Sequence, residues 1–167
     1  YLQQHLNDYV GALKLLPVRL LRMYINAYQS YLWNETLALY LKEQGRILPE
    51  IPYSLGTLVF VPNPQDYIHL QIPLIGFGSQ NVASDEVREI IAYLLKRENI
   101  TYDDFVIKQI PELTLEGELR PAMMEVHDLK ISIFEDDELN PGKKKVLVSF
   151  VLGKGSYATM VIKVMFY

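Results

Sequence analysis

Hydrophobic positions divide the chain into a helical first part and a last part with strands. Apolar residues recur at helical spacing from Leu2 to about Leu16, and a longer helical pattern runs from Pro17 to Gly45. Proline fits the first turn of a helix, and glycine is a common residue just after its end. The longer pattern predicts a helix of about 27 residues. Its wide apolar face predicts that this helix is largely buried.

The middle of the chain is rich in proline and then returns to a helical pattern. The segments "TLVFV" and "YIHLQIPL" are predicted to be short edge strands, because nearby prolines cannot donate to a central sheet. A helix follows in "NVASDEVREIIAYLLKREN", with Ser84 as its cap and Asp85 and Glu86 in its first turn. A short capped helix is predicted to begin near Thr101, and "LTLEGELRPAMM" predicts a turn into extended chain.

The last part alternates between apolar and polar residues. "HDLKISIFEDD" and "KKVLVSFVL" predict two strands, and Asn140-Pro141-Gly142 between them suits a type II turn. A helix after "GKGS" is predicted to carry Ser156 as its N-cap. A lone hairpin is marginal in water, so this one is expected to join a larger sheet than the chain offers. The predicted fold class is α+β.

Composition narrows the possible functions only partly. The net charge of −4 gives no general support for RNA binding, although local patches matter more than the sum. Without cysteine the chain has no disulfide and no thiolate metal site, so an intracellular, cytoplasmic setting is expected. No apolar run has the roughly 18 residues of a membrane helix, and the N-terminus predicts no signal peptide.

Candidate catalytic motifs are weak when judged from spacing alone. The "GKGS" turn lacks the earlier glycine of a Walker A loop, so a nucleotide site is not predicted there. His5, His69 and His127 are far apart in the sequence, and no metal or cofactor is expected. No Ser/His/Asp arrangement can be argued. Acidic residues at 135–137 and lysines at 143–145 are expected to stay solvated.

A polar stripe on the predicted long helix allows two interpretations. Its residues follow one another at spacings of three and four: Arg19, Arg22, Asn26, Gln29 and Trp33. They could be solvated or bonded to neighbouring backbone, as polar groups usually are. Alternatively, they could form a surface on which Arg pairs with phosphate and Trp stacks on a base.

Four segments together resemble the TruD family of tRNA pseudouridine synthases. Ala27 to Asn34 match the family's A-Y-Q-S-Y-L-[WF]-N pattern, and Ile72 to Gly76 resemble its L-P-L-P-G segment with Ile75 at the second proline. Gly117, Arg120 and Pro121 are similar to its G-x-x-R-x stretch. "FVLGKGSYATMVIKVM" resembles the C-terminal F-x-L-P-x-G-S-[YF]-A-T-x-x-[LV]-R-E-[LF] motif. The matches occur in the family's order.

The resemblance implies a divided architecture. In the family, a catalytic domain built on a mixed sheet is interrupted by an α/β insertion domain. Residues 1–124 then correspond to most of the insertion domain, and residues 125–167 to the end of the catalytic domain. The family's G-x-K-D-[KR]-x-A-x-[TS] motif, which carries the catalytic aspartate, is absent from this chain. We therefore expect a C-terminal fragment that is inactive alone, whose partner is the missing N-terminal part.

The resemblance also implies a reaction and its site residues. The family isomerises a uridine in tRNA, commonly uridine 13, without cofactor or metal. The target base leaves its stack, and the aromatic residue of the C-terminal motif, here Tyr157, lies against it. Lys154, Ser156 and Lys163 belong to the same motif, with Gly153 in place of its proline and Lys163-Val164 in place of its Arg-Glu. Arg120 is expected to join the RNA-contacting residues.

Two other functions remain open at this stage. The chain could be a non-catalytic RNA-binding module derived from the same family. It could also be a protein-interaction domain that uses the wide aromatic helix. If the chain is the enzyme fragment or the RNA-binding module, its partner is tRNA. No membrane is expected to be involved.

Overall fold

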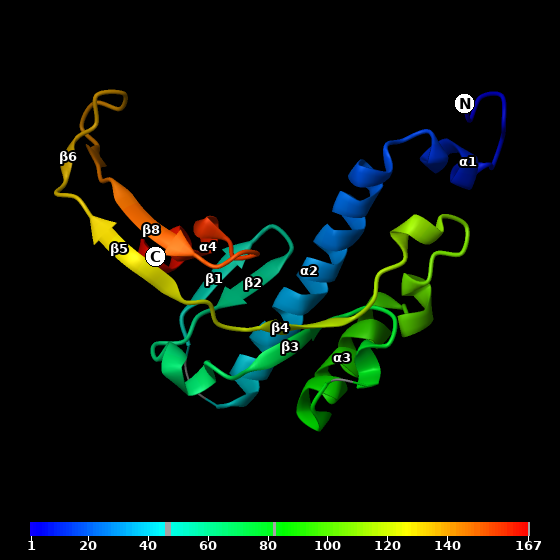
Figure 1. Cartoon of the computed structure of the whole chain (residues 1–167), viewed down its shortest axis with the longest axis horizontal. Coiled ribbons are helices and arrows are strands. Elements are labelled where there is room, and N and C mark those ends of the chain that lie inside the picture. Colours follow the sequence, from blue (N-terminus) through cyan, green and yellow to red (C-terminus); the bar gives the residue numbers. More distant parts are fainter. Residues whose placement is uncertain (46–47, 82, 167) are drawn as a thin grey trace. The chain divides into compact units, whose positions relative to one another are not determined.

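The structure is a computed structural model that describes residues 1–45, 48–81 and 83–166. The chain divides into two compact units, Tyr1–Ala122 and Met123–Tyr167. Each unit combines helices with small antiparallel sheets, and the chain is an α+β protein as expected (Figure 1). Every sheet formed by described residues has two strands.

Helix α2 (Val18–Glu43) is the longest element of the first unit and confirms the predicted helix. Pro17 is its N-cap, and Gly45 follows the C-cap Gln44 with a left-handed φ of 70°. The C-terminal half of α2 is buried as predicted, with Leu32 and Leu41 inside the core. The N-terminal half is not. Met23 is 56% exposed and Tyr24 is 59% exposed, so the prediction of a largely buried helix is wrong there.

Helix α1 (Tyr9–Lys14) is much shorter than the predicted helix from Leu2 to Leu16. Asn7 has a left-handed φ of 67°, which interrupts the helical path. Asp8 then caps α1, because its Oδ1 accepts a hydrogen bond from the Gly11 N–H at 2.8 Å. No side chain of α1 is buried, so its apolar spacing has no core to face.

Helix α3 (Asp85–Glu98) packs against α2 and follows its prediction closely. Ser84 Oγ accepts from the Val87 N–H at 3.4 Å, and Asn99 ends the helix in the left-handed conformation. The main core cluster joins α2, α3 and strand β3. Its buried members are Leu32, Trp33, Ile72, Ile75, Ala83, Val87, Ile91, Leu95 and Phe105.

Short strands and 3-10 turns complete the first unit. Strand β1 (Glu50–Tyr53) pairs with β2 (Gly56–Val59), and β3 (Gln71–Leu74) pairs with β4 (Glu118–Pro121). Both predicted strand segments therefore contain strands, although the start of "YIHLQIPL" is a turn. The 3-10 turns are η1 (Pro64–Tyr67), η2 (Ser79–Asn81), η3 (Tyr102–Phe105) and η4 (Pro111–Leu113). Thr101 caps η3, as predicted.

The second unit is the predicted hairpin followed by a helix. Strand β5 (Val126–Ile131) pairs with β8 (Val148–Leu152), and β6 (Glu135–Asp136) pairs with β7 (Lys144–Lys145). The Lys143 N–H donates to Asn140 O at 3.0 Å, and Gly142 has a φ of 80°, as a type II turn requires. Helix α4 (Ala158–Met165) begins one residue late, with Tyr157 and not Ser156 as its N-cap.

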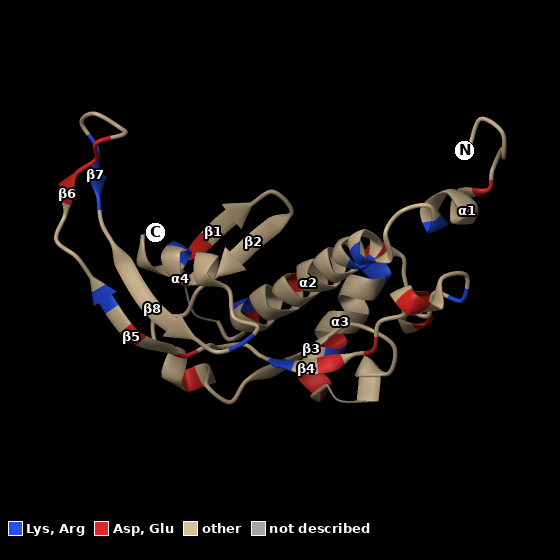
Figure 2. Cartoon of the chain, turned by 45° about the horizontal axis from the view of Figure 1, so that its top comes forward, with Lys and Arg blue, Asp and Glu red and all other residues tan. Residues whose placement is uncertain are grey.

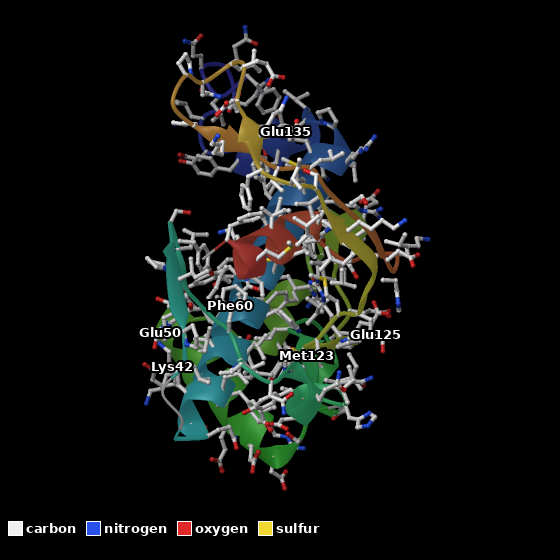
Figure 3. All side chains as sticks on the ribbon, turned by 90° about the vertical axis from the view of Figure 1, so that its left-hand side faces the viewer. Lys42, Glu50, Phe60, Met123, Glu125 and Glu135 are labelled. Carbon is white, nitrogen blue, oxygen red and sulfur yellow. The ribbon has the colours of Figure 1, made fainter. Side chains whose placement is uncertain are left out.

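Much of the apolar surface of the hairpin is open. The predicted inner face of β8 is half-buried, whereas Val151 on its other face and Leu147 just before the strand are exposed. On the first strand, Leu129, Ile131 and Ile133 are all exposed. In Figure 3 the hairpin runs from the labelled Glu125 to Glu135 near its far end. An isolated two-stranded hairpin is at best marginally stable in water, and apolar surface of this extent is typical of a site that another segment covers.

Candidate RNA-contact residues and the family to which they belong

Two residues of the predicted polar stripe are buried and bonded to backbone. Gln29 Nε2 donates a hydrogen bond to Ile75 O at 3.0 Å, and Trp33 Nε1 donates to Ile72 O at 3.0 Å. Both side chains lie in the core of the first unit. A base in solution cannot stack on a buried indole. Gln29 and Trp33 are therefore polar residues hydrogen-bonded to backbone, which is the first of the two interpretations of the stripe, and not an RNA surface.

The segments that resemble the family motifs meet at this point. Strand β3 overlaps the segment Ile72–Gly76, strand β4 lies in Gly117–Pro121, and Ile72 is paired with Arg120. The Arg120 guanidinium carbon lies 4.9 Å from the centre of the Trp33 ring. This cation–π contact places the Arg120 guanidinium over the indole ring. Three sequence-distant segments therefore hold one another in place.

Gly76 and Gly117 allow two chain segments to approach closely beside this contact. The Phe77 N–H donates to Leu115 O at 2.9 Å, and the Gly117 N–H donates to Phe77 O at 2.9 Å. A Cβ at Gly76 would lie 2.8 Å from the backbone of Glu116, and one at Gly117 would overlap Ser79. Both glycines are needed because backbone, and not a flexible side chain, fills the space.

We expect Gly117→Ala to lower the free energy of unfolding by about 3 kcal/mol, because the new methyl group forces Ser79 and its backbone away. Urea denaturation followed by circular dichroism measures this loss. Gly153→Ala is the matched control. Gly153 has no atom within 4 Å of the added methyl group, so its effect should stay within about 0.5 kcal/mol. Equal effects of the two substitutions would contradict the close approach.

The exposed members of the stripe occupy the N-terminal half of α2. Arg19, Arg22 and Asn26 are all exposed. Arg22 Nε donates to Glu112 O at 2.9 Å, which ties this half of the helix to η4. Beneath it, Leu21 packs with Ile110 and Leu113 in a second core cluster. The structure thus divides the predicted stripe into an exposed half and a buried half.

A charged network between the middle of α2 and the C-terminal end of α3 was not predicted. Arg97 donates to Glu35 Oε2 at 3.1 Å, to Glu98 Oε1 at 3.1 Å and to the Tyr31 hydroxyl at 2.8 Å. Burial opposes the charge of Arg97, but its hydrogen bonds with Glu35 and Glu98 outweigh burial and raise its pKa. Burial, then the hydrogen bond to Glu98, raises the pKa of Tyr31. Tyr31 and Glu35 lie more than 60 residues before Arg97 in the sequence, so no local pattern indicates these two partners.

Lys154, Ser156 and Tyr157 of the C-terminal motif lie together at one turn in the second unit. Gly155 has a φ of 87°, and the Ser156 N–H donates to Gly153 O at 3.2 Å. The Tyr157 side chain is 54% exposed at the start of α4. Lys154 is exposed in the turn, and Ser156 is half-buried. An exposed phenol ring beside an ammonium group can stack on a base and attract a phosphate.

Lys163 lies apart from that turn, in the last turn of α4, and is exposed. Its charge suits the negative end of the helix dipole, which is a structural role. The family motif has arginine at this position, and a guanidinium can pair with a carboxylate through two hydrogen bonds. Among the described residues no carboxylate pairs with Lys163. Lys163 therefore lies at the opposite end of α4 from Tyr157, away from the turn at Gly153–Ser156.

Charges at the hairpin end pair with each other. Lys144 Nζ lies 2.5 Å from Asp136, and Lys145 Nζ lies 2.5 Å from Glu138. Figure 2 shows acidic β6 beside basic β7, and this agrees with the expected solvated loop. Among the described residues, no cluster of His, Cys, Asp or Glu could hold a metal ion. No helix in the described ranges is long and apolar enough to cross a membrane.

A comparison of the sequence with models of known families matches one family over most of the chain. The model of the family "tRNA pseudouridine synthase D (TruD)" matches residues 1–52 and 63–165. The chain belongs to the TruD family. The two matched ranges include the four segments in which the resemblance was found, from Ala27 in α2 to Met165 at the end of α4.

Individual TruD relatives are similar to this chain over nearly its whole length. The "Probable tRNA pseudouridine synthase D 2" of Methanocaldococcus jannaschii is 38% identical, over 94% of this chain and 38% of the relative. The relative from Nanoarchaeum equitans is 35% identical, over 99% of this chain and 39% of its own length. The chain thus spans about two fifths of the length of the relatives that it matches.

A solved structure has the same fold. The crystal structure of the TruD protein from Methanosarcina mazei matches with a TM-score of 0.64 and 31% identity. The match covers 97% of this chain and 41% of that protein. With 31% identity, this match supports membership of the same family as well as the same fold.

Proposed function

We propose that this chain is part of an enzyme that isomerises uridine to pseudouridine in tRNA, with uridine 13 as the position that the TruD resemblance implies. The match of the TruD family model to residues 1–52 and 63–165 is the observation that carries this proposal. The relatives' own names, such as that of the Nanoarchaeum equitans protein, support the reaction class.

The two units are proposed to serve different parts of that enzyme. Residues 1–124 would be most of the insertion domain, and residues 125–167 would be the end of the catalytic domain. The division of the chain after Ala122 supports this assignment. The open apolar surface of the hairpin supports it too, because Leu129 and Val151 need a larger sheet to cover them.

In this proposal the nucleophile lies outside the chain, and the described residues bind and position RNA. Tyr157 would hold the flipped uracil by stacking on its ring, and Lys154 would pair with a neighbouring phosphate. Ser156, half-buried in the same turn, would help to hold that turn in place. Arg120, held on the Trp33 ring in the first unit, would offer a positive charge to RNA.

The proposal is tested by assaying pseudouridine formation in an unmodified tRNA transcript. We expect the full-length protein to form pseudouridine without added metal or cofactor, and this 167-residue chain alone to form none. Pseudouridine formed by the chain alone would contradict the absence of the nucleophile. Binding of tRNA by the full-length protein without any pseudouridine would favour a non-catalytic RNA-binding module.

A further inference from the structure

The N-terminal half of α2 has one polar side that is open to solvent. Arg19, Arg22 and Asn26 follow one another at spacings of three and four residues, so they lie within about 60° of the helix circumference. All three residues are exposed. Tyr24 and Tyr28 lie on a different side of the helix. We call Arg19, Arg22 and Asn26 the arginine face.

The positive charge of the arginine face is not balanced by acids of the same stretch of helix. Residues 18–34 contain Arg19 and Arg22 but no aspartate or glutamate, although the whole chain has 20 acidic and 16 basic residues. The first acid of α2 is Glu35, whose carboxylate accepts hydrogen bonds from Arg97. Figure 2 shows blue at the N-terminal end of α2. The arginine face is therefore a local positive patch on a chain that is negative overall.

Arg19 and Arg22 differ from the arginines of α3 in having no carboxylate partner among the described residues. Arg88 Nη1 lies 2.9 Å from Asp85 Oδ1, and Arg97 lies 3.1 Å from each of two glutamate side chains. Each arginine of α3 is therefore compensated within the chain. In the described ranges no ion pair or hydrogen bond involves the Arg19 side chain, so its charge is available to an external anion.

Arg22 is held in place by a neutral acceptor. Its Nε donates to Glu112 O, a backbone carbonyl, at 2.9 Å, and no described ion pair joins it to the Glu112 carboxylate. Its two terminal nitrogens make no hydrogen bond with a described residue. The terminal N–H groups of a guanidinium form a fixed fork that matches two oxygens of one phosphate. Arg22 is thus a positioned cation whose charge is not neutralised within the described chain.

We propose that the arginine face binds the sugar–phosphate backbone of the tRNA substrate. Arg19 and Arg22 contact phosphate oxygens, and the Asn26 amide donates to a phosphate or ribose oxygen beside them. The inference rests on the proposed function, because it takes tRNA as the ligand. The three residues include no aromatic ring on which a base could stack. The contact therefore depends on charge and does not read the RNA sequence.

A phosphate backbone suits this face better than a protein partner does. The centre of a protein interface is depleted in charged residues, and a partner that covered Arg19 and Arg22 would have to supply a carboxylate for each. RNA carries a phosphate at every nucleotide, so two cations one helical turn apart can both be matched. A second copy of the chain would bring arginine against arginine if the two faces met, because residues 18–34 contain no acid.

The salt dependence of tRNA binding tests the phosphate contacts. Binding of an unmodified transcript by the full-length protein is measured over a series of salt concentrations. We expect Arg19→Ala to reduce the slope of log Kd against log salt by about 1, and Arg19→Ala with Arg22→Ala to reduce it by about 2, because each substitution removes one phosphate contact. The double variant should also bind the transcript about tenfold more weakly.

Two variants serve as controls for the loss of charge. Arg19→Lys keeps the positive charge and should keep the slope of the wild-type protein. Lys96→Ala removes an exposed charge of the same sign from α3, a helix with more acidic than basic residues, and should leave the slope unchanged. Because the Arg19 side chain makes no described polar contact, its variants should keep the wild-type melting temperature.

A second RNA tests whether the contact is made to the backbone. A hairpin RNA of unrelated sequence should lose affinity on Arg19→Ala by the same factor as the tRNA transcript, because both present the same phosphate groups. A loss confined to the tRNA transcript would mean that the face reads bases or tRNA shape, and would contradict the inference.

Two further results would overturn the inference. One is an unchanged salt slope in the double variant. The other is a changed oligomeric mass of the double variant with unchanged tRNA affinity, which would assign the face to a protein partner. Pseudouridine formation by the wild-type protein reports separately on the proposed function. Normal product formation with an unchanged slope would refute the arginine face alone, whereas a reduced slope without any wild-type product would refute only the proposed function.

Discussion

Trp33→Ala is expected to lower the free energy of unfolding by about 3–5 kcal/mol, the range for losing a large buried aromatic side chain. Three interactions end together. The core loses the indole, Ile72 O loses its donor, and Arg120 loses the ring on which it lies. Urea denaturation followed by far-ultraviolet circular dichroism measures the loss, since the chain has a single tryptophan and its fluorescence disappears with the substitution.

Trp33→Phe separates the packing of Trp33 from its hydrogen bond. Phenylalanine keeps an aromatic ring in the core but cannot donate to Ile72 O, and we expect a loss of about 1 kcal/mol from the hydrogen bond in addition to some packing loss. A stable Trp33→Ala protein that binds tRNA poorly would mean that Trp33 contacts RNA, contrary to its burial.

Tyr157→Ala is expected to lower kcat/KM for pseudouridine formation by the full-length protein roughly 10- to 100-fold. The estimate comes from losing one stacking contact of about 1–3 kcal/mol on the flipped base. Because more than half of the Tyr157 side chain is exposed, its removal should cost little folding free energy. Single-turnover assays on an unmodified transcript, together with a melting temperature, distinguish these two effects.

Two variants serve as controls for Tyr157. Tyr157→Phe keeps the ring and should retain most of the activity if stacking is the role of this residue. Tyr93→Ala removes a similarly exposed ring from α3 and should leave kcat/KM near the wild-type value. If Tyr157→Phe were as slow as Tyr157→Ala, the hydroxyl and not the ring would be the important group.

The family motifs contain residues of two kinds, and the structure distinguishes them. Gln29, Trp33 and Gly117 hold segments of the first unit together, through hydrogen bonds to the backbone of β3 and of the residue just after it, and through a close backbone approach. Tyr157 and Lys154 lie exposed on a turn, where a ligand can reach them. A motif identifies the family equally well through both kinds, so it does not show which residues meet the substrate.

Local sequence patterns determined the elements whose ends carry their own signals. The side chain of Ser84 caps the start of α3, and Asn99 ends that helix in the left-handed conformation. Thr101 caps the start of η3. The turn at Asn140–Gly142 was predictable because only a few residues suit its backbone angles. The helix predicted from Leu2 failed because its apolar spacing had no core to pack against, and spacing alone does not reveal the partner.

By itself, the sequence of this protein determined the α+β class, the long helix that begins after Pro17, the hairpin and the TruD resemblance, because these depend on residues that are close in the chain or on motif order. Only the tertiary structure decided which polar residues of α2 are buried. The partners of Gln29 and Trp33 are carbonyl groups 46 and 39 residues away. A stripe with one spacing therefore supports the core at Trp33 and faces solvent at Arg19, according to what packs against each half of the helix.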